Sequence, residues 1–341
     1  MITPNTTIIA EAGVNHNGCL TSARQLIDAA SNAGADFIKF QTFKTESLVT
    51  STADKADYQK RSDQTDQSQY DMLKQLELDR SCHETLVDYC RNKTAKFVSS
   101  AFDIDSIDLL VELNIPFFKI PSGEITNLNY LRHVGSLNKP IVMSTGIATL
   151  DEVKSALNIL FDSGVRKEDI TLLHCNTEYP TPMADVNLKA MLAIRDALGV
   201  QVGYSDHTLG IEVPIAAVAM GATVIEKHFT LDRKLPGPDQ QASLEPEEMA
   251  ALIRALRNVE IALGDGRKVP VRSEGDTLRV ARRSLVATTA IPCGTCLTEE
   301  MVGLRRPGTG LPPHMRPIVV GRTAVDDIPA GTMIALGMLG S

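Results

Sequence analysis

Two histidines stand at the ends of apolar runs in the second half of the chain. His207 closes the run "QVGYSDH", and His228 stands in "TVIEKHF". Side chains alternate along a strand, so Ser205 shares a direction with His207, and Glu226 shares one with His228. Two imidazoles with oxygen ligands suit a divalent transition metal such as Mn²⁺ that keeps open positions for a substrate. The alternative is a pair of hydrogen-bonded histidines inside a barrel, because two histidines alone are a weak signature.

A second group of residues is cationic and rich in hydroxyls. It consists of Lys39, Ser100, Lys119, Ser122, Ser144 and Ser205. Such a set binds a phosphate or a carboxylate well. The alternative is that each lysine forms a structural ion pair with a neighbouring glutamate. Lys119 also allows a third interpretation, a Schiff-base aldolase that carries its lysine on a barrel strand.

Further polar side chains lie at or just beyond the ends of apolar runs. They are Glu11, Gln41, Glu124, Thr177, Tyr179 and Asp239. Glu124 could ligate a metal directly or through water, and Asp239 is a candidate acceptor for sugar hydroxyls. The alternative for Thr177 and Tyr179 is a rigid connector, since prolines stiffen "CNTEYPTP".

Eight short apolar runs position these residues, and amphipathic stretches separate most of them. The runs cover 6–13, 37–43, 96–102, 117–123, 140–146, 170–176, 201–207 and 223–229. Strands that alternate with helices predict a (β/α)8 TIM barrel, in which the carboxyl ends of the strands meet at the catalytic face. An open doubly wound sheet is the alternative. No G-x-G-x-x-G follows the first run, which weakens a dinucleotide-binding interpretation.

The rest of the chain predicts a second, smaller domain. Residues 1–264 carry the barrel pattern, residues 265–280 lose periodicity and are typical of a linker, and residues 281–341 form a small β-rich domain with several turns. The polar segment 44–79 is predicted to be a loop on the active face and part of a lid. Cys293 and Cys296 in "CGTC" are interpreted as a turn, because a second cysteine pair for a zinc site is missing.

Composition narrows the class of protein. The chain has 341 residues, 43% hydrophobic, with a net charge of −8, which is typical of a globular protein and argues against nucleic acid as a partner. No apolar run is long enough to span a membrane, and the N-terminus lacks the pattern of a secretory signal. Scattered cysteines indicate a reducing, cytoplasmic setting.

The motifs together resemble one family. "AEAGVNHNG", "IKFQTFK", "IPSGEITNLNYL", "STGIATLDE", "LHCNTEYPTP", "GYSDHTLG", "IEKHFTLD" and "RRPGTG" are similar to motifs of the bacterial sialic acid (nonulosonic acid) synthase family, and the match spans nearly the whole chain in order. The resemblance implies a (β/α)8 barrel followed by an antifreeze-like (SAF) domain. It also implies a domain-swapped homodimer in which the SAF domain covers the partner's active site.

The resemblance further implies a condensation of phosphoenolpyruvate with an N-acetylated mannosamine-type sugar in its open aldehyde form. Water enters, phosphate leaves, and a divalent metal polarises the aldehyde. By resemblance, His207 and His228 hold the metal, with Glu124 near its water. The phosphoenolpyruvate-binding set is Lys39, Ser100, Lys119, Ser122, Ser144, Thr177 and Ser205, and the sugar-handling set is Glu11, Gln41, Tyr179 and Asp239. Glu11 or Glu124 transfers a proton, and Arg306 reaches the sugar's N-acetyl group from the partner's small domain.

The resemblance leaves the exact sugar open. N-acetylneuraminate and N,N'-diacetyllegionaminate synthases share many of these motifs, and "ADYQK" and "ASLEP" favour the legionaminate branch. Three positions depart from the pattern that the resemblance implies: Ser100 stands where other members carry threonine, Thr177 where some members carry asparagine, and Gln240 where this branch is expected to carry histidine. A non-catalytic carbohydrate-binding protein is a rival suggested by the antifreeze-like tail, and eight strands that end in a catalytic set of residues argue against it.

Overall fold

The computed structural model of the chain describes residues 6–62 and 67–340. Eight parallel strands form a closed barrel in sequence order, so the predicted TIM barrel is confirmed and the open sheet is excluded. The strands are β1 Thr7–Gly13, β2 Phe37–Thr42, β3 Lys96–Ala101, β4 Phe118–Ile120, β5 Ile141–Ser144, β6 Ile170–His174, β7 Gln201–Asp206 and β8 Val224–His228. The strands β8 and β1 close the barrel through pairs that run from Thr7↔Val224 to Glu11↔His228.

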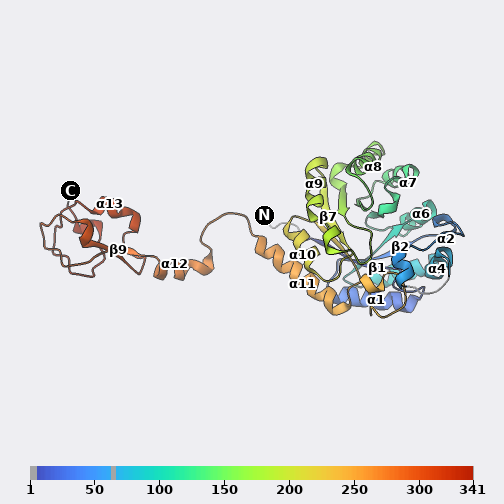
Figure 1. Cartoon of the computed structure of the whole chain (residues 1–341), viewed down its shortest axis with the longest axis horizontal. Helices are drawn as coiled ribbons and strands as arrows, with labels where there is room; N and C mark the ends of the chain where they lie inside the picture. The colour runs from blue at the N-terminus through green and yellow to red at the C-terminus, as the bar shows by residue number, and fades with distance from the viewer. Residues whose placement is uncertain (1–5, 63–66, 341) are drawn as a thin grey trace. The chain divides into compact units, whose positions relative to one another are not determined.

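Helices cover the outside of the barrel, as Figure 1 shows for α7, α8 and α9. The helices of this unit are α1 Leu20–Ala33, α2 Thr45–Leu48, α3 Asp57–Ser62, α4 Gln69–Leu76, α5 Arg80–Cys90, α6 Ile104–Glu112, α7 Leu128–Gly135, α8 Leu150–Asp162, α9 Leu188–Leu198, α10 Glu212–Ala219 and α11 Pro246–Leu263. Local sequence sets several of their ends. Thr149 and Glu152 form a capping box at the start of α8, and Gly34 ends α1 with a φ of +92° that favours glycine. Within the described residues, no helix has the length and apolarity of a membrane span.

The interior of the barrel has an apolar floor. Six buried side chains, one from each of six strands or their starts, form this layer: Ile9, Val98, Phe117, Val142, Leu173 and Val224. Alternate side chains along a strand share a direction, and two positions beyond the floor residue five of these segments carry an ionisable or hydroxyl side chain, while the sixth carries Cys175. The floor therefore lies one layer beneath the side chains that could do chemistry.

The segment after β2 differs from the prediction. It was expected to be a loop, and its described part contains the short helices α2, α3 and α4. The Ser68 side chain accepts a hydrogen bond from the Asp71 amide and so caps α4. Met72 and Leu76 of α4 pack with Val14 and Phe43 in a small apolar cluster. Burial of one helical face explains why this polar segment is helical.

The chain divides into two compact units, Met1–Gly264 and Asp265–Ser341. The second unit contains α12 Gly275–Ala281, β9 Ser284–Ala287, β10 Val302–Arg305 and α13 Arg316–Val319, and β9 pairs antiparallel with β10. The segment predicted to be a linker thus includes most of α12. Cys293 and Cys296 are exposed free thiols on either side of a turn at Gly294, which has a φ of +80°, so the prediction of a turn is confirmed.

Candidate active site

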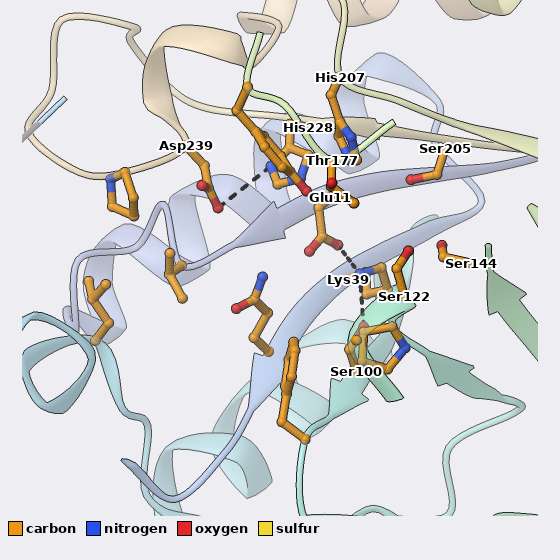
Figure 2. Close-up of a pocket in the computed structure, with 18 of the residues that line it drawn as sticks. Glu11, Lys39, Ser100, Ser122, Ser144, Thr177, Ser205, His207, His228 and Asp239 are labelled. Atoms are coloured by element: carbon orange, nitrogen blue, oxygen red, sulfur yellow. Dashed lines mark hydrogen bonds and ion pairs between the residues drawn. The ribbon is translucent and has the colours of Figure 1, made fainter. Parts of the chain in front are cut away.

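A cavity of about 390 Å³ opens at the carboxyl ends of the barrel strands (Figure 2). Most of the residues singled out from the sequence line it: Glu11, Lys39, Gln41, Ser100, Lys119, Ser122, Ser144, Thr177, Tyr179, Ser205, His207, His228 and Asp239. These residues come together because each follows the apolar floor of its strand or lies in the loop beyond it.

Two of the predicted site residues are not among those of the first unit that line the cavity. Glu124 ends the 3₁₀ turn Ser122–Glu124 and accepts a hydrogen bond of 2.7 Å from Asn127, outside the lining of the cavity. Arg306 belongs to the second unit, Asp265–Ser341. The roles of both residues stay predictions.

A network of buried ionisable groups lines the centre of the cavity. The Lys39 ammonium lies 2.6 Å from Glu11 and 3.7 Å from Glu226, and the Lys119 ammonium lies 3.7 Å from Glu226. Sequence reasoning paired Glu226 with His228 by alternation but gave it no role in the site. Alternation along the strand could have identified Glu226 as a site residue. It stands two positions after Val224, just as Lys39 follows Phe37 and Lys119 follows Phe117.

Each lysine also contacts a hydroxyl. Lys39 donates to Ser100 over 3.0 Å, and Lys119 donates to Ser144 over 2.7 Å. The two interpretations from the sequence are therefore compatible, because the same lysines have a glutamate on one side and a serine on the other. The serine side leaves hydroxyl donors for an anion in the cavity.

The two glutamates of the network differ in charge. Burial raises the pKa of Glu11 to about 8, against the opposing effect of Lys39. Burial also acts to raise the pKa of Glu226, but Lys119, Lys39 and the hydrogen bond from Ser205 outweigh it, and the pKa falls. At neutral pH Glu11 is thus a neutral carboxylic acid and Glu226 a carboxylate. Such divergence between neighbouring carboxyls is the pattern of acid–base pairs in active sites.

The two imidazoles lie at the rim of the cavity. The ring centroids of His207 and His228 are 5.3 Å apart, and the Tyr179 ring packs against both, with centroid distances of 4.1 Å and 5.2 Å. Burial lowers the pKa of His207 to about 4 and lowers that of His228 well below its usual value. Both rings are therefore neutral, which is the form that binds a metal.

The hydrogen bonds of the imidazoles fit a metal site. His207 Nδ1 donates to the Asn176 carbonyl, which leaves the lone pair of Nε2 free. His228 Nδ1 is buried without a hydrogen-bond partner in the described residues, and its nearest carboxylate, Asp239, lies 3.8 Å away. The described residues include no group of three or more histidine, cysteine or acidic side chains arranged for a metal. The donor set is thus two nitrogens, which fits a transition metal whose other positions are open.

The loop after β8 places Asp239 at the opposite side of the cavity from the serines. Burial raises the pKa of Asp239 to about 6, with Lys39 opposing the shift. Its neighbour Gln240 is fully buried, donates to the Asn15 carbonyl over 3.1 Å, and accepts from the Thr230 hydroxyl. Gln240 therefore anchors the loop and does not line the cavity.

One wall of the cavity comes from the segment 44–79, which the sequence predicted to lie on the active face. Helix α4 contributes Gln69, Met72, Leu73 and Leu76, and Leu48 and Val49 adjoin them. This wall is largely apolar, whereas the charged and hydroxyl side chains of the cavity come from the barrel strands or the loops that follow them and lie above the apolar floor. The expected position of this segment on the active face is therefore confirmed, its helices were not predicted, and its role in a lid stays a prediction.

Comparison with known proteins settles the family. The NeuB family model matches residues 26–268, and the SAF domain model matches residues 282–340. The chain belongs to the NeuB family. The resemblance noted from the sequence motifs is therefore confirmed, as is the expected SAF domain.

Individual members of the NeuB family are similar over most of their length. The chain is 49% identical to the N,N'-diacetyllegionaminic acid synthase of Campylobacter jejuni, covering 90% of this chain and 92% of that protein. It is 45% identical to the enzyme of the same name from Legionella pneumophila, with 96% and 92% covered. The crystal structure of an N-acetylneuraminic acid synthetase from Leptospira borgpetersenii, in complex with citrate, is 32% identical with a TM-score of 0.71, covering 81% of this chain and 90% of that one.

Proposed function

We propose that this protein is a nonulosonate synthase. It condenses phosphoenolpyruvate with an open-chain N-acetylated mannosamine-type sugar and water, and it releases a nine-carbon 2-keto acid and phosphate. The observation that carries the proposal is the cavity in which Lys39, Lys119 and the cavity serines face two neutral imidazoles. Relatives named as synthases of this class, at 45–49% identity over 90% or more of the chain, support it.

The cationic part of the cavity accounts for phosphoenolpyruvate binding. The ammonium groups and the hydroxyls of Ser100, Ser122, Ser144 and Ser205 supply donors for the phosphate and the carboxylate. Thr177 adds one more hydroxyl at the edge of this set. Because the ammonium groups and the hydroxyls of Ser100, Ser144 and Ser205 are buried and hydrogen-bonded in advance, they bind the anion with little reorganisation.

The sugar is assigned to the side of the cavity that holds Glu11, Gln41, Tyr179 and Asp239. Carbon three of phosphoenolpyruvate forms a bond to the sugar's aldehyde carbon, and the aldehyde oxygen takes a proton. Water adds to carbon two, and phosphate leaves with cleavage of the C–O bond. Glu11 is a protonated carboxyl at neutral pH, so it can donate the proton to that oxygen. Glu124, outside the cavity lining, is the second candidate for proton transfer.

His207 and His228 would hold a divalent metal, and we propose Mn²⁺. When bound, the metal supplies Lewis acidity that polarises the sugar aldehyde. Tyr179 packs on both imidazoles and restricts their rotation. The buried rings stay neutral and available to the metal over the physiological range of pH.

We propose the legionaminate branch for the sugar, with 2,4-diacetamido-2,4,6-trideoxymannose as substrate. Its support is the higher identity to synthases of that name than to the pseudaminic acid synthase of Campylobacter jejuni, which is 35% identical. We also propose a domain-swapped homodimer in which Arg306 of one subunit serves the site of the other. The free thiols of the described cysteines are consistent with work in the cytoplasm, which we propose as the location.

A substrate panel tests the proposal. Purified protein, phosphoenolpyruvate and Mn²⁺ are incubated with 2,4-diacetamido-2,4,6-trideoxymannose or with N-acetylmannosamine, and phosphate release is followed. Faster release with the diacetamido sugar supports the legionaminate branch, and faster release with N-acetylmannosamine assigns the neuraminate branch. No release with either sugar would overturn the proposed reaction. A Schiff-base aldolase would instead be trapped by borohydride at Lys119, and a carbohydrate-binding protein would bind a sugar without turnover.

A further inference from the structure

A buried ion pair lies behind the two imidazoles, on the outer side of the barrel wall. Lys227 donates to Asp206 over 2.6 Å, and neither side chain is exposed. Both residues are adjacent in sequence to the imidazoles, Asp206 to His207 and Lys227 to His228. Ser205 and Glu226 line the cavity and the pair does not, so the pair points to the opposite face of the sheet.

The pair is saturated with hydrogen bonds that reach past His207. Asp206 accepts from the Thr208 amide over 3.0 Å and from the Thr208 hydroxyl over 2.8 Å. Lys227 also donates to the Thr208 carbonyl. His207 therefore lies between two residues, Asp206 and Thr208, that are both tied to the strand that carries His228.

The ion pair lies where the ends of β7 and β8 are held together, next to the two imidazoles. The register of β7 and β8 ends at Asp206↔Lys227, so the ion pair is the last cross-link between these two strands. Beyond it, His207 leaves β7, and the His228 carbonyl accepts from Leu244 on the loop side. The separation of the two rings depends on how firmly the two strand ends are held together at this point.

Stability alone does not require such a pair. Taking two charges out of water is costly, and replacing a buried ion pair with apolar residues of similar volume is often neutral or stabilising. A better-attested use of buried charges is to specify one alignment among several of similar energy. An apolar pair here would fill the same space and allow the strand ends to shift.

We propose that Asp206 and Lys227 are positioning residues that set the distance between His207 and His228 and thereby the affinity for the metal. This inference rests on the proposed function, since it assumes that the two imidazoles share one ion. The pair touches neither the metal nor the substrate, and it acts through the backbone next to each ligand.

The test is Mn²⁺ affinity measured on metal-free protein, with free Mn²⁺ followed by its paramagnetic resonance. The double variant Asp206→Leu/Lys227→Met removes both charges and leaves neither one unpaired. We expect roughly tenfold weaker Mn²⁺ binding, the low end of effects known for residues that support metal ligands. The melting temperature of the metal-free protein should also fall, because the buried Thr208 amide, hydroxyl and carbonyl lose hydrogen-bond partners. Saturating Mn²⁺ should restore much of the lost kcat.

A matched control comes from the opposite end of the barrel. Arg257 and Asp36 form an ion pair of 3.1 Å at the start of β2, and Arg257→Met/Asp36→Leu should leave Mn²⁺ affinity unchanged. If the first double variant does not fold, Thr208→Val keeps the ion pair, removes one anchor of Asp206, and should weaken Mn²⁺ binding several-fold.

The outcomes separate this inference from the proposed function. Equal Mn²⁺ affinity in wild type and a folded variant, with turnover retained, would overturn the positioning role and leave the proposed synthase intact. Wild-type protein that releases phosphate but binds no Mn²⁺ would overturn both this inference and the proposed metal site.

Discussion

Glu11 gives the sharpest prediction of stability against pH. Its carboxyl is 1% exposed, it lies 2.6 Å from Lys39, and burial raises its pKa from 4.5 to about 8. Between these two pH values the folded protein holds a proton on Glu11 that the unfolded chain has released. Folding is therefore favoured at low pH, and this contribution to stability is lost as pH rises from about 4.5 to about 8.

The size of the pH effect on the free energy of unfolding follows from the single proton that Glu11 binds in the folded protein. Its contribution changes the free energy of unfolding by about 1.4 kcal/mol for each pH unit within that window. In Glu11→Gln the side chain keeps its size and does not titrate. The stability of Glu11→Gln relative to wild type should therefore rise by roughly 3 kcal/mol between about pH 5 and pH 7.5.

Urea unfolding followed by far-ultraviolet circular dichroism measures this difference, since the chain has no tryptophan to report by fluorescence. Reversibility is checked by refolding from urea at each pH. Glu247→Gln, the same change at an exposed glutamate of α11, is the control and should show a difference from wild type that stays constant over the window. A difference for Glu11→Gln that is constant or falls with pH would refute the argument that burial outweighs Lys39.

The remaining predictions concern the metal, the charge network and the loop after β8. EDTA should abolish phosphate release, Mn²⁺ should restore it, and His228→Ala should lose it while the circular dichroism spectrum stays that of wild type; activity in excess EDTA would contradict the metal site. Glu226→Gln should cost roughly 3 kcal/mol in urea unfolding, because it removes the carboxylate shared by two buried lysines, whereas the exposed Glu112→Gln should cost less than about 1 kcal/mol. Gln240→Ala should cost about 1–3 kcal/mol, since it strands buried polar partners, and should leave the KM for phosphoenolpyruvate unchanged; a raised KM would place Gln240 in the anion site.

Much of the site could be predicted before any coordinates existed. Lys39 and Lys119 lie within their strands and Ser144 ends its strand, and alternation along a strand dictates which neighbours share their direction. Because the strands are parallel and successive, their carboxyl ends meet at one mouth, so polar run ends converge whatever the details of packing. The fold and the lining of the cavity followed from these two regularities.

Other features depended on which distant segments meet. Part of the polar segment after β2 is helical, and Met72 and Leu76 of its helix α4 pack against Val14 and Phe43. Gln240 lies outside the lining of the cavity because its side chain forms buried hydrogen bonds with Asn15 and Thr230. Asn15 lies 225 positions from Gln240 in the sequence, and Val14 is likewise distant from Met72 and Leu76, so local propensity could not predict either arrangement.

The sequence by itself determined the order of the strands, the apolar floor and the kind of chemistry at the mouth. These features depend on two repeats that can be read from the sequence: the alternation of side chains along a strand, and the alternation of strands with helices along the chain. The tertiary structure decided the charges. Glu11 is neutral because burial outweighs the attraction of Lys39, whereas Glu226 is ionised because Lys119 and Lys39 outweigh burial. Electrostatic energy depends on distance and on exclusion of water, and both exist only once the barrel has closed.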